Sequence, residues 1–308
     1  MVLRDTKSEE RRIMEFNYLS EIVEFCRREG KDMAQAMVEY EKRNKGLTRE
    51  QIYDGLKRVL LVMEESVDQG MTQDVITPSG MLNNWAKTIA RSPVDTLGSA
   101  LKRATARAIA VGEVNACMGK IVAAPTAGSA GIMPAVLVTM IEEHKIPRER
   151  ILDALLVSSA VGLVFAKNSS FAGSEAGCMG ETGSAAAMGA AAITYLLGGN
   201  EDQILEAVGF ALKASMGLVC DPVGGLVEEP CTTRNAVGLA NAFVSAQMAL
   251  AGVKSLIPAD EVIAATKEVG DLMSPRLKES GQGGLANTKT GREIQKKVFM
   301  TVREKGTL

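Results

Sequence analysis

The sequence of 308 residues predicts an all-α, or nearly all-α, fold with a single helical domain over residues 1–308. Capping signals and apolar residues at helical spacing recur along the chain, whereas alternating strand patterns are scarce. Aromatic residues make up only 4% of the chain and glycines number 30, so small-residue central helices must pack closely. Charge is concentrated in the outer segments. These features indicate a solvated helical layer around a tightly packed centre, with glycine-rich loops carrying the site.

Residues 1–100 are predicted to form charged outer helices. Thr48 with Gln51 matches a capping box, in which each side chain satisfies a backbone N–H group at the start of a helix. Apolar side chains then recur at helical spacing, which is typical of a helix with one buried face. These residues are Ile52, Leu56, Val59, Leu60, Met63 and Val67.

Residues 115–286 are expected to form the core that holds the cofactor and the substrate. Between positions 151 and 199 the charged side chains are Asp153, Lys167, Glu175 and Glu181. The apolar stretches 151–166 and 184–197 fall short of the roughly 20 apolar residues that a membrane span needs, so we expect buried helices. Residues 120–124 are a short strand candidate, and an extended loop is the alternative.

Helix signals continue into the last third of the chain. Asn200 precedes two acidic residues, an N-cap pattern in which negative charge favours the positive end of the helix dipole. Pro258 and Asp260 open a further helix, which we expect to run through Val269. Charge returns after Pro258 and ends in a tail rich in Lys and Arg.

Composition excludes several classes of function. A formal net charge of −2 argues against a general nucleic-acid binder, because phosphate contacts need clustered Lys and Arg. The single histidine, His144, lies in a charged segment typical of an exposed helix end, and it cannot build a multi-histidine metal site. Five cysteines without a secretory signal do not predict a disulfide framework. We therefore expect a cytoplasmic protein with no nucleic-acid or membrane partner.

Three glycine-rich segments, predicted to be loops, concentrate the polar chemistry. Residues 123–131 precede an apolar helix, where free backbone N–H groups suit a carboxylate or phosphate, although a tight connection between buried helices fits equally well. Residues 167–183 gather a lysine, an amide, hydroxyls, two carboxylates and a thiol, which are costly to bury without partners or a ligand. Residues 219–235 contain Asp-Pro and Gly-Gly turns that we expect to bring Cys220 and Cys231 close together.

The same segments resemble the α chain of iron–sulfur L-serine dehydratases, most strongly from position 120 to position 286. The matching motifs are A-P-T-A-G-S-A-G, N-S-S-F-A-G-S-E-A-G-C, C-D-P-V-G-G-L-V-E-E-P-C-T-T-R-N-A and G-Q-G-G-L-A. The resemblance implies an L-serine ammonia-lyase that converts L-serine to pyruvate and ammonia. It also implies that Cys178, Cys220 and Cys231 hold a 4Fe–4S cluster.

The chemistry of that reaction is consistent with three cysteine ligands. Four thiolates close a 4Fe–4S cluster, whereas three leave one iron open to act as a Lewis acid on the serine hydroxyl. Without a Lewis acid on its oxygen, the serine hydroxyl is a poor leaving group. We expect residues of the first two segments to bind the substrate, with Glu175 pairing with its ammonium group. The other residues expected to bind the substrate are Thr126, Gly128, Ser129, Gly131, Asn168 and Ser169.

The catalytic base and a fourth cluster ligand stay open at this point. Lys167 is the candidate base, but it could equally anchor its segment or a substrate carboxylate, and a partner chain could supply the base instead. Cys117 is the candidate for a fourth ligand, since Cys26 is expected to be a buried helix residue. The resemblance implies a two-chain enzyme, so we expect a separate smaller β chain and an oligomer.

Three other functions compete with this one. A pyridoxal-phosphate dehydratase would use Lys167 as the Schiff base and residues 126–131 as a phosphate cradle, but it leaves the cysteines unexplained. A non-catalytic iron–sulfur or zinc-binding subunit is the second, although zinc sites favour cysteine pairs roughly two to four residues apart. A lyase similar to L-cysteine desulfidase is the third, because it would use the same elimination chemistry.

Overall fold

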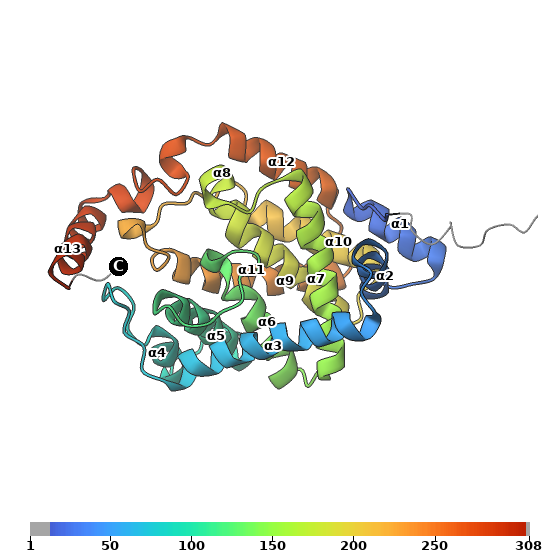
Figure 1. Ribbon diagram of the computed structural model, residues 1–308, viewed down its shortest axis with the longest axis horizontal. Coiled ribbons are helices and arrows are strands. Elements are labelled where there is room, and N and C mark those ends of the chain that lie inside the picture. The colour runs from blue at the N-terminus through green and yellow to red at the C-terminus, as the bar shows by residue number, and fades with distance from the viewer. Residues whose placement is uncertain (1–12, 306–308) are drawn as a thin grey trace, which may run out of the picture.

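The structure, a computed structural model, describes residues 13–305, and every regular element in that range is a helix (Figure 1). The same range holds two isolated β-bridges, Ile76 with Asn83 and Cys220 with Lys278. The prediction of an all-α fold is therefore confirmed. Residues 120–124, the short strand candidate, form an extended connection without regular structure.

The central helix of the bundle is α9 (Ser184–Leu196), and it packs against four other helices. These are α6 (Ile132–Glu142), α7 (Arg148–Asn168), α10 (Glu201–Ala214) and α11 (Cys231–Leu250). A Cβ atom at Gly189 of α9 would lie 3.2 Å from Ala242 Cβ and 3.3 Å from Val136 Cγ2. Small residues therefore let α6, α9 and α11 approach closely, as the composition predicts.

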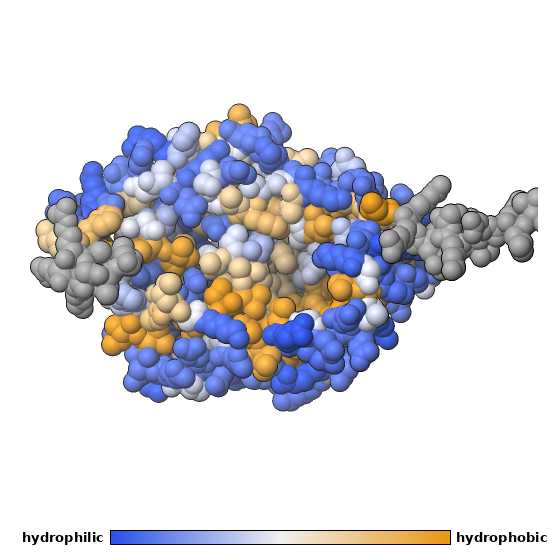
Figure 2. Space-filling model, in the orientation of Figure 1, coloured by the Kyte–Doolittle hydropathy of each residue, from blue (hydrophilic) through white to orange (hydrophobic). Residues whose placement is uncertain are grey.

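The helices of the N-terminal third cover this core. They are α1 (Leu19–Glu29), α2 (Met33–Lys45), α3 (Arg49–Thr72) and α4 (Trp85–Arg91), followed by α5 (Ser99–Ala116), which contacts both α3 and α11. The predicted capping box is formed, because Thr48 Oγ1 accepts a hydrogen bond from Gln51 N at 3.2 Å and Gln51 Oε1 accepts one from Thr48 N at 2.8 Å. Figure 2 shows hydrophilic residues along the edges of one face and hydrophobic residues gathered across its middle.

The two helices predicted in the last third are also present. α10 follows the N-cap Asn200, whose Oδ1 accepts a hydrogen bond from Gln203 N at 3.0 Å. α12 (Ala259–Leu272) begins after Pro258 and runs slightly beyond the predicted end at Val269. The remaining elements are α8 (Gly173–Cys178), α13 (Lys289–Lys305) and the short helical turns η1 (Ala127–Ser129), η2 (Met179–Gly183), η3 (Val223–Gly225), η4 (Pro275–Leu277) and η5 (Gly284–Asn287).

α7 is the one helix of the described residues that is long and apolar enough to cross a membrane, with a mean hydropathy of 1.5 over its most apolar window. It is longer than the predicted stretch 151–166, because turns at both ends extend it to 21 residues. The expectation that this stretch is too short for a span is therefore wrong. However, 67% of that window is buried inside the protein, where α7 packs against α2 and α9. The predicted buried helix is confirmed.

Most of residues 167–183 are helical, so the prediction of a long loop is wrong. α7 continues through Asn168, α8 follows after a short connection, and the π-helical turn η2 leads directly into α9. Gly177 has φ +64, and a Cβ atom there would lie 2.8 Å from the carbonyl oxygen of Leu218. The glycines in this segment allow close backbone contact between buried helices, which a local sequence pattern does not distinguish from a loop.

Replacing Gly70 of α3 with alanine is expected to lower the free energy of unfolding by about 1–3 kcal/mol, the usual effect of overpacking a core. A Cβ atom at Gly70 would lie 2.4 Å from the carbonyl oxygen of Ala110 on α5, so the two helices would have to separate. Gly55, on the same helix, has no heavy atom within 4 Å of its Cβ position. Gly55→Ala is the matched control and should stabilise by up to about 1 kcal/mol. Urea denaturation measures the free energy of unfolding of both variants. Equal values for the two variants would contradict the close contact between α3 and α5.

Candidate metal centre

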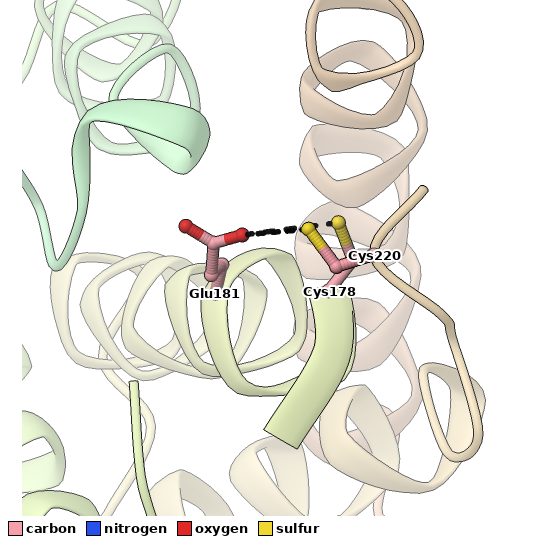
Figure 3. A group of neighbouring side chains, drawn as sticks. All are labelled: Cys178, Glu181 and Cys220. Carbon is pink, nitrogen blue, oxygen red and sulfur yellow. Dashed lines mark hydrogen bonds between the residues drawn. The ribbon is translucent and has the colours of Figure 1, made fainter. Parts of the chain in front are cut away.

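Cys178 and Cys220 bring their thiols together with the carboxylate of Glu181 in the buried interior of the protein (Figure 3). One donor atom of each residue lies within 4.8 Å of the other two, and each residue is less than 9% exposed. Glu181 Oε2 lies 3.9 Å from Cys178 Sγ and 3.7 Å from Cys220 Sγ. Thiolates and carboxylates are metal-ligand groups, so this cluster is the candidate metal centre of the described residues.

Each member of the group is fixed by its backbone. Cys178 is the last residue of α8, and Glu181 follows within the π-helical turn η2, so the two side chains leave adjacent turns. Cys220 follows α10, where its N–H donates to the carbonyl of Leu277 at 2.9 Å and its carbonyl accepts from Glu279 N at 2.8 Å. This short bridge holds Cys220 in place, although the residue lies outside any helix.

Glycines leave room for these groups to approach one another. A Cβ atom at Gly173 would lie 2.9 Å from both Cys220 Sγ and Glu181 Oε2, and one at Gly128 would lie 3.0 Å from Glu181 Oε1. A larger residue at either position would push against the donor atoms. The glycines of these motifs are thus needed so that the backbone can pack against the donor atoms, in addition to any turns that they allow.

Arg234, in the first turn of α11, supplies the positive charge at this site. Its Nη1 donates to Cys178 Sγ at 3.4 Å and to the carbonyl of Val219 at 2.8 Å, and its Nη2 pairs with Asp221 Oδ1 at 2.7 Å. A hydrogen bond from Cys220 and the charge of Arg234 lower the pKa of Cys178. The pKa of Cys220 is raised, because its proton is shared with Cys178 and because it is buried. The pair therefore favours one thiolate, at Cys178.

Cys231 is the first residue of α11. It is buried, and burial followed by the negative charges of Cys178 and Glu181 raises its pKa. Its closeness to Cys220 stays a prediction. Cys231 is not a member of the tight donor group formed by Cys178, Glu181 and Cys220.

The first glycine-rich segment reaches the site through a network of hydrogen bonds. Thr126 Oγ1 donates to Glu181 Oε1 at 2.8 Å and lies 3.1 Å from Ser129 Oγ. Asn235 ties this segment to α11, because its Nδ2 donates to the carbonyls of Gly128 and Cys231 at 2.7 and 2.8 Å. Its Oδ1 accepts from Gly131 N at 2.8 Å. The backbone N–H of Gly131 is thus already hydrogen-bonded to Asn235, whereas the hydroxyls of Thr126 and Ser129 lie beside the donor group.

Lys167 and Asn168 both donate hydrogen bonds to the segment that precedes α1. Lys167 Nζ donates to the carbonyl of Phe16 at 2.7 Å, and Asn168 Nδ2 donates to the carbonyl of Asn17 at 2.6 Å. Both side chains therefore hold the segment that precedes α1 against the end of α7. For Lys167 this is the anchoring alternative that the sequence left open.

The other predicted residues differ in their surroundings. Ser169 Oγ is buried without a hydrogen-bond partner among the described residues. Its neighbour Ser170 lies against η2, because a Cβ atom at Gly180 would be 2.5 Å from the Ser170 carbonyl oxygen. Glu175 is exposed in the first turn of α8 and is not part of the donor group.

The remaining cysteines and the histidine lie apart from the donor group. Cys117 is half-buried, and its Sγ donates to the carbonyl of Ile76 at 3.5 Å. Cys26 is buried on α1, where burial raises its pKa to about 12, so its prediction as a core residue is confirmed. His144 is exposed after α6, as predicted.

Two site residues escaped the sequence-based prediction, Glu181 and Arg234. Glu181 could have been found as one of the few charges in the apolar region between positions 151 and 199. Arg234 stands within the C-T-T-R-N motif, but only the fold brings it back to Cys178.

Comparison with known proteins gives consistent results. Residues 28–286 match a family model described as serine dehydratase alpha chain. The L-serine dehydratase, alpha chain, of Peptoniphilus asaccharolyticus is 46% identical over 283 residues, which cover 91% of this chain and 97% of that protein. The probable L-serine dehydratase, alpha chain, of Bacillus subtilis is 42% identical, covering 92% and 95%. The L-serine dehydratase of Streptomyces coelicolor is 38% identical over 86% of this chain but only 59% of its own length.

Arg234→Gln is expected to raise the pKa of Cys178 and to slow alkylation of this thiol near neutral pH. The substitution removes a hydrogen-bond donor and a positive charge that stabilise the thiolate. Iodoacetamide labelling of reduced, metal-free protein, followed by mass spectrometry over a range of pH, measures the effect. Cys117 serves as the internal control, because Arg234 does not contribute to its pKa. A pH profile of Cys178 that does not move would contradict the assigned role of Arg234.

Proposed function

The chain belongs to the serine dehydratase alpha-chain family, and on that premise we propose that it converts L-serine to pyruvate and ammonia with a 4Fe–4S cluster. The ligands would be Cys178, Cys220 and Cys231. The observation that carries the proposal is the convergence of buried thiols from separate segments around Glu181. All five cysteines are free thiols, which also supports a location in the reducing cytoplasm.

The residues present fit an iron–sulfur cluster in their chemistry. Such clusters are held by thiolates, and Cys178 is the thiol whose pKa the site lowers. A cluster with thiolate ligands carries negative charge, and the buried guanidinium of Arg234 lies beside Cys178 to balance it. Gly173 and Gly128 keep side chains out of the space next to the donor atoms. When bound, the cluster would supply a Lewis acid that polarises the C–O bond of the serine hydroxyl.

The chain's own residues would orient the substrate. The hydroxyl of Ser129 lies 3.1 Å from Thr126 Oγ1 and can turn to donate to the serine carboxylate, whereas the Thr126 hydroxyl holds Glu181 Oε1. Ser169 Oγ is a further candidate, because it is buried without a partner and its segment packs on η2. Burial of Cys178, Glu181 and Cys220 excludes bulk water, which strengthens every charge interaction in the pocket. Gly131 would contribute through its hydrogen bond to Asn235, which positions the segment.

A second, smaller chain would complete the enzyme. The Peptoniphilus asaccharolyticus and Bacillus subtilis relatives, whose names contain "alpha chain", align over 97% and 95% of their length, whereas the Streptomyces coelicolor protein aligns over only 59%. We propose that a separate β chain supplies what the longer protein carries in one polypeptide. Since the structure uses Lys167 as an anchor, the base that removes the α-proton is assigned to this partner. The assembly would be an oligomer of both chains.

The pyridoxal-phosphate alternative loses its main support. The ammonium of Lys167 is bound to the Phe16 carbonyl, and the described residues form no alternating strands and helices. A zinc site would hold a different metal, and a purely structural site would show no activity on L-serine. Metal analysis and an activity assay therefore separate these alternatives from the proposed function.

Cys178→Ser is expected to abolish most of the bound iron and acid-labile sulfide, because it removes the thiolate that Arg234 stabilises. The chain is co-expressed with its β chain, purified without oxygen, and assayed for iron, sulfide and pyruvate formation from L-serine. Cys117→Ser is the matched control, since this thiol donates only to the Ile76 carbonyl, and it should retain the cluster and activity.

Three results would contradict the proposed function. Wild-type protein without iron and sulfide would exclude the cluster, and zinc in their place would favour a structural metal site. Loss of the cluster in Cys117→Ser would indicate a fourth cysteine ligand. Release of sulfide from L-cysteine at a higher rate than pyruvate from L-serine would favour the desulfidase-like alternative.

A further inference from the structure

The two oxygens of Glu181 have different partners. Oε1 accepts a hydrogen bond from Thr126 Oγ1 at 2.8 Å, which fixes the carboxylate. Oε2 points at the sulfurs of both Cys178 and Cys220, at 3.9 and 3.7 Å (Figure 3). The side chain is only 8% exposed, so its orientation toward the thiols is set by the protein and not by solvent. One oxygen is therefore held, and the other is presented to the donor group.

The thiol-facing oxygen of Glu181 has only weak hydrogen-bond donors. Oε2 accepts from the Sγ–H groups of Cys178 and Cys220 at 3.9 and 3.7 Å, and the guanidinium of Arg234 is used by Cys178 and Asp221. A metal bound by the two cysteines would displace both Sγ–H protons. The buried carboxylate would then need the metal itself as its partner.

Other oxygen and sulfur donors are less suitably placed. Glu279 and Glu175 are exposed and neither belongs to the tight donor group, although Glu279 Oε2 lies 3.2 Å from the Cβ position of Gly173. Cys117 donates to a carbonyl outside it. Gly173 and Gly128 flank the Glu181 carboxylate so closely that a Cβ atom at either would lie 2.9 or 3.0 Å from one of its oxygens. The fold therefore reserves space for this carboxylate beside the thiols.

We propose that Glu181 is an oxygen ligand of the cluster, at the iron that the three cysteines leave open, when L-serine is absent. The inference rests on the proposed function and adds a ligand to it. L-Serine would take the place of Oε2, one oxygen donor for another, without any change in oxidation state. The released carboxylate stays in the pocket because Thr126 continues to hold Oε1.

Glu181→Gln tests the ligand, because the amide keeps the size of the side chain and an oxygen that can accept from Thr126 but binds iron poorly. Mössbauer spectra of ⁵⁷Fe-loaded, serine-free protein report the environment of each iron. Wild-type protein should show one iron distinct from the others, and Glu181→Gln should shift that signal while retaining iron and sulfide. Glu268→Gln, at an exposed position of α12, is the matched control and should match the wild type.

The remaining outcomes also decide the question. A fully loaded Glu181→Gln protein with a wild-type spectrum would overturn the ligand while leaving the proposed function intact. If Glu181→Gln loses the cluster, Glu181→Asp provides the second test. Recovery of the cluster by Asp, with circular dichroism showing both variants folded, supports the carboxylate as a ligand, whereas loss in both variants counts against it. Wild-type protein without iron would overturn the proposed function itself.

Discussion

This structure depends on close contacts between backbone segments at glycine positions, where a side chain would not fit. Gly131 would place a Cβ atom 2.2 Å from the carbonyl oxygen of Ala108, and Gly173 would place one against the Cys220 thiol. The first contact sets the distance between α5 and the start of α6, and the second lets the thiols and Glu181 share one pocket. A chain with only 4% aromatic residues builds its core by this kind of contact. Small residues therefore serve packing and the site together.

The pairing of buried charged groups is the second constraint, and it follows from the tight packing. Tight packing removes water from Cys178, Glu181 and Asp221, so each needs a partner inside the protein. Arg234 serves two of them, since it bonds Cys178 and pairs with Asp221. Glu181 accepts one hydrogen bond from the Thr126 hydroxyl and two long ones from the thiols of Cys178 and Cys220. If a metal displaced the thiol protons, the carboxylate would need that metal as its partner, which is the physical reason to expect a cation at this group.

Much of the fold could be predicted from local signals, whereas the site depended on tertiary packing. The caps at Thr48 and Asn200 marked helix starts correctly, because capping is a property of a few adjacent residues. The segment 167–183 was mistaken for a loop, because a local pattern does not distinguish glycines that allow contact between buried helices from glycines in a loop. The cysteines stood in motifs that could be identified. The hydrogen-bond partner of Lys167, the carbonyl of Phe16, could not be identified from the sequence because it lies 151 residues away.

We propose that the buried thiols of Cys178, Cys220 and Cys231 surround an iron–sulfur cluster. Anomalous X-ray diffraction at the iron absorption edge, from crystals of anaerobically prepared protein, would locate the iron. We expect one compact iron peak bordered by these three sulfurs, with the Glu181 carboxylate facing it. Protein that is active on L-serine without iron beside these cysteines, or with iron bound elsewhere in the chain, would contradict this proposal.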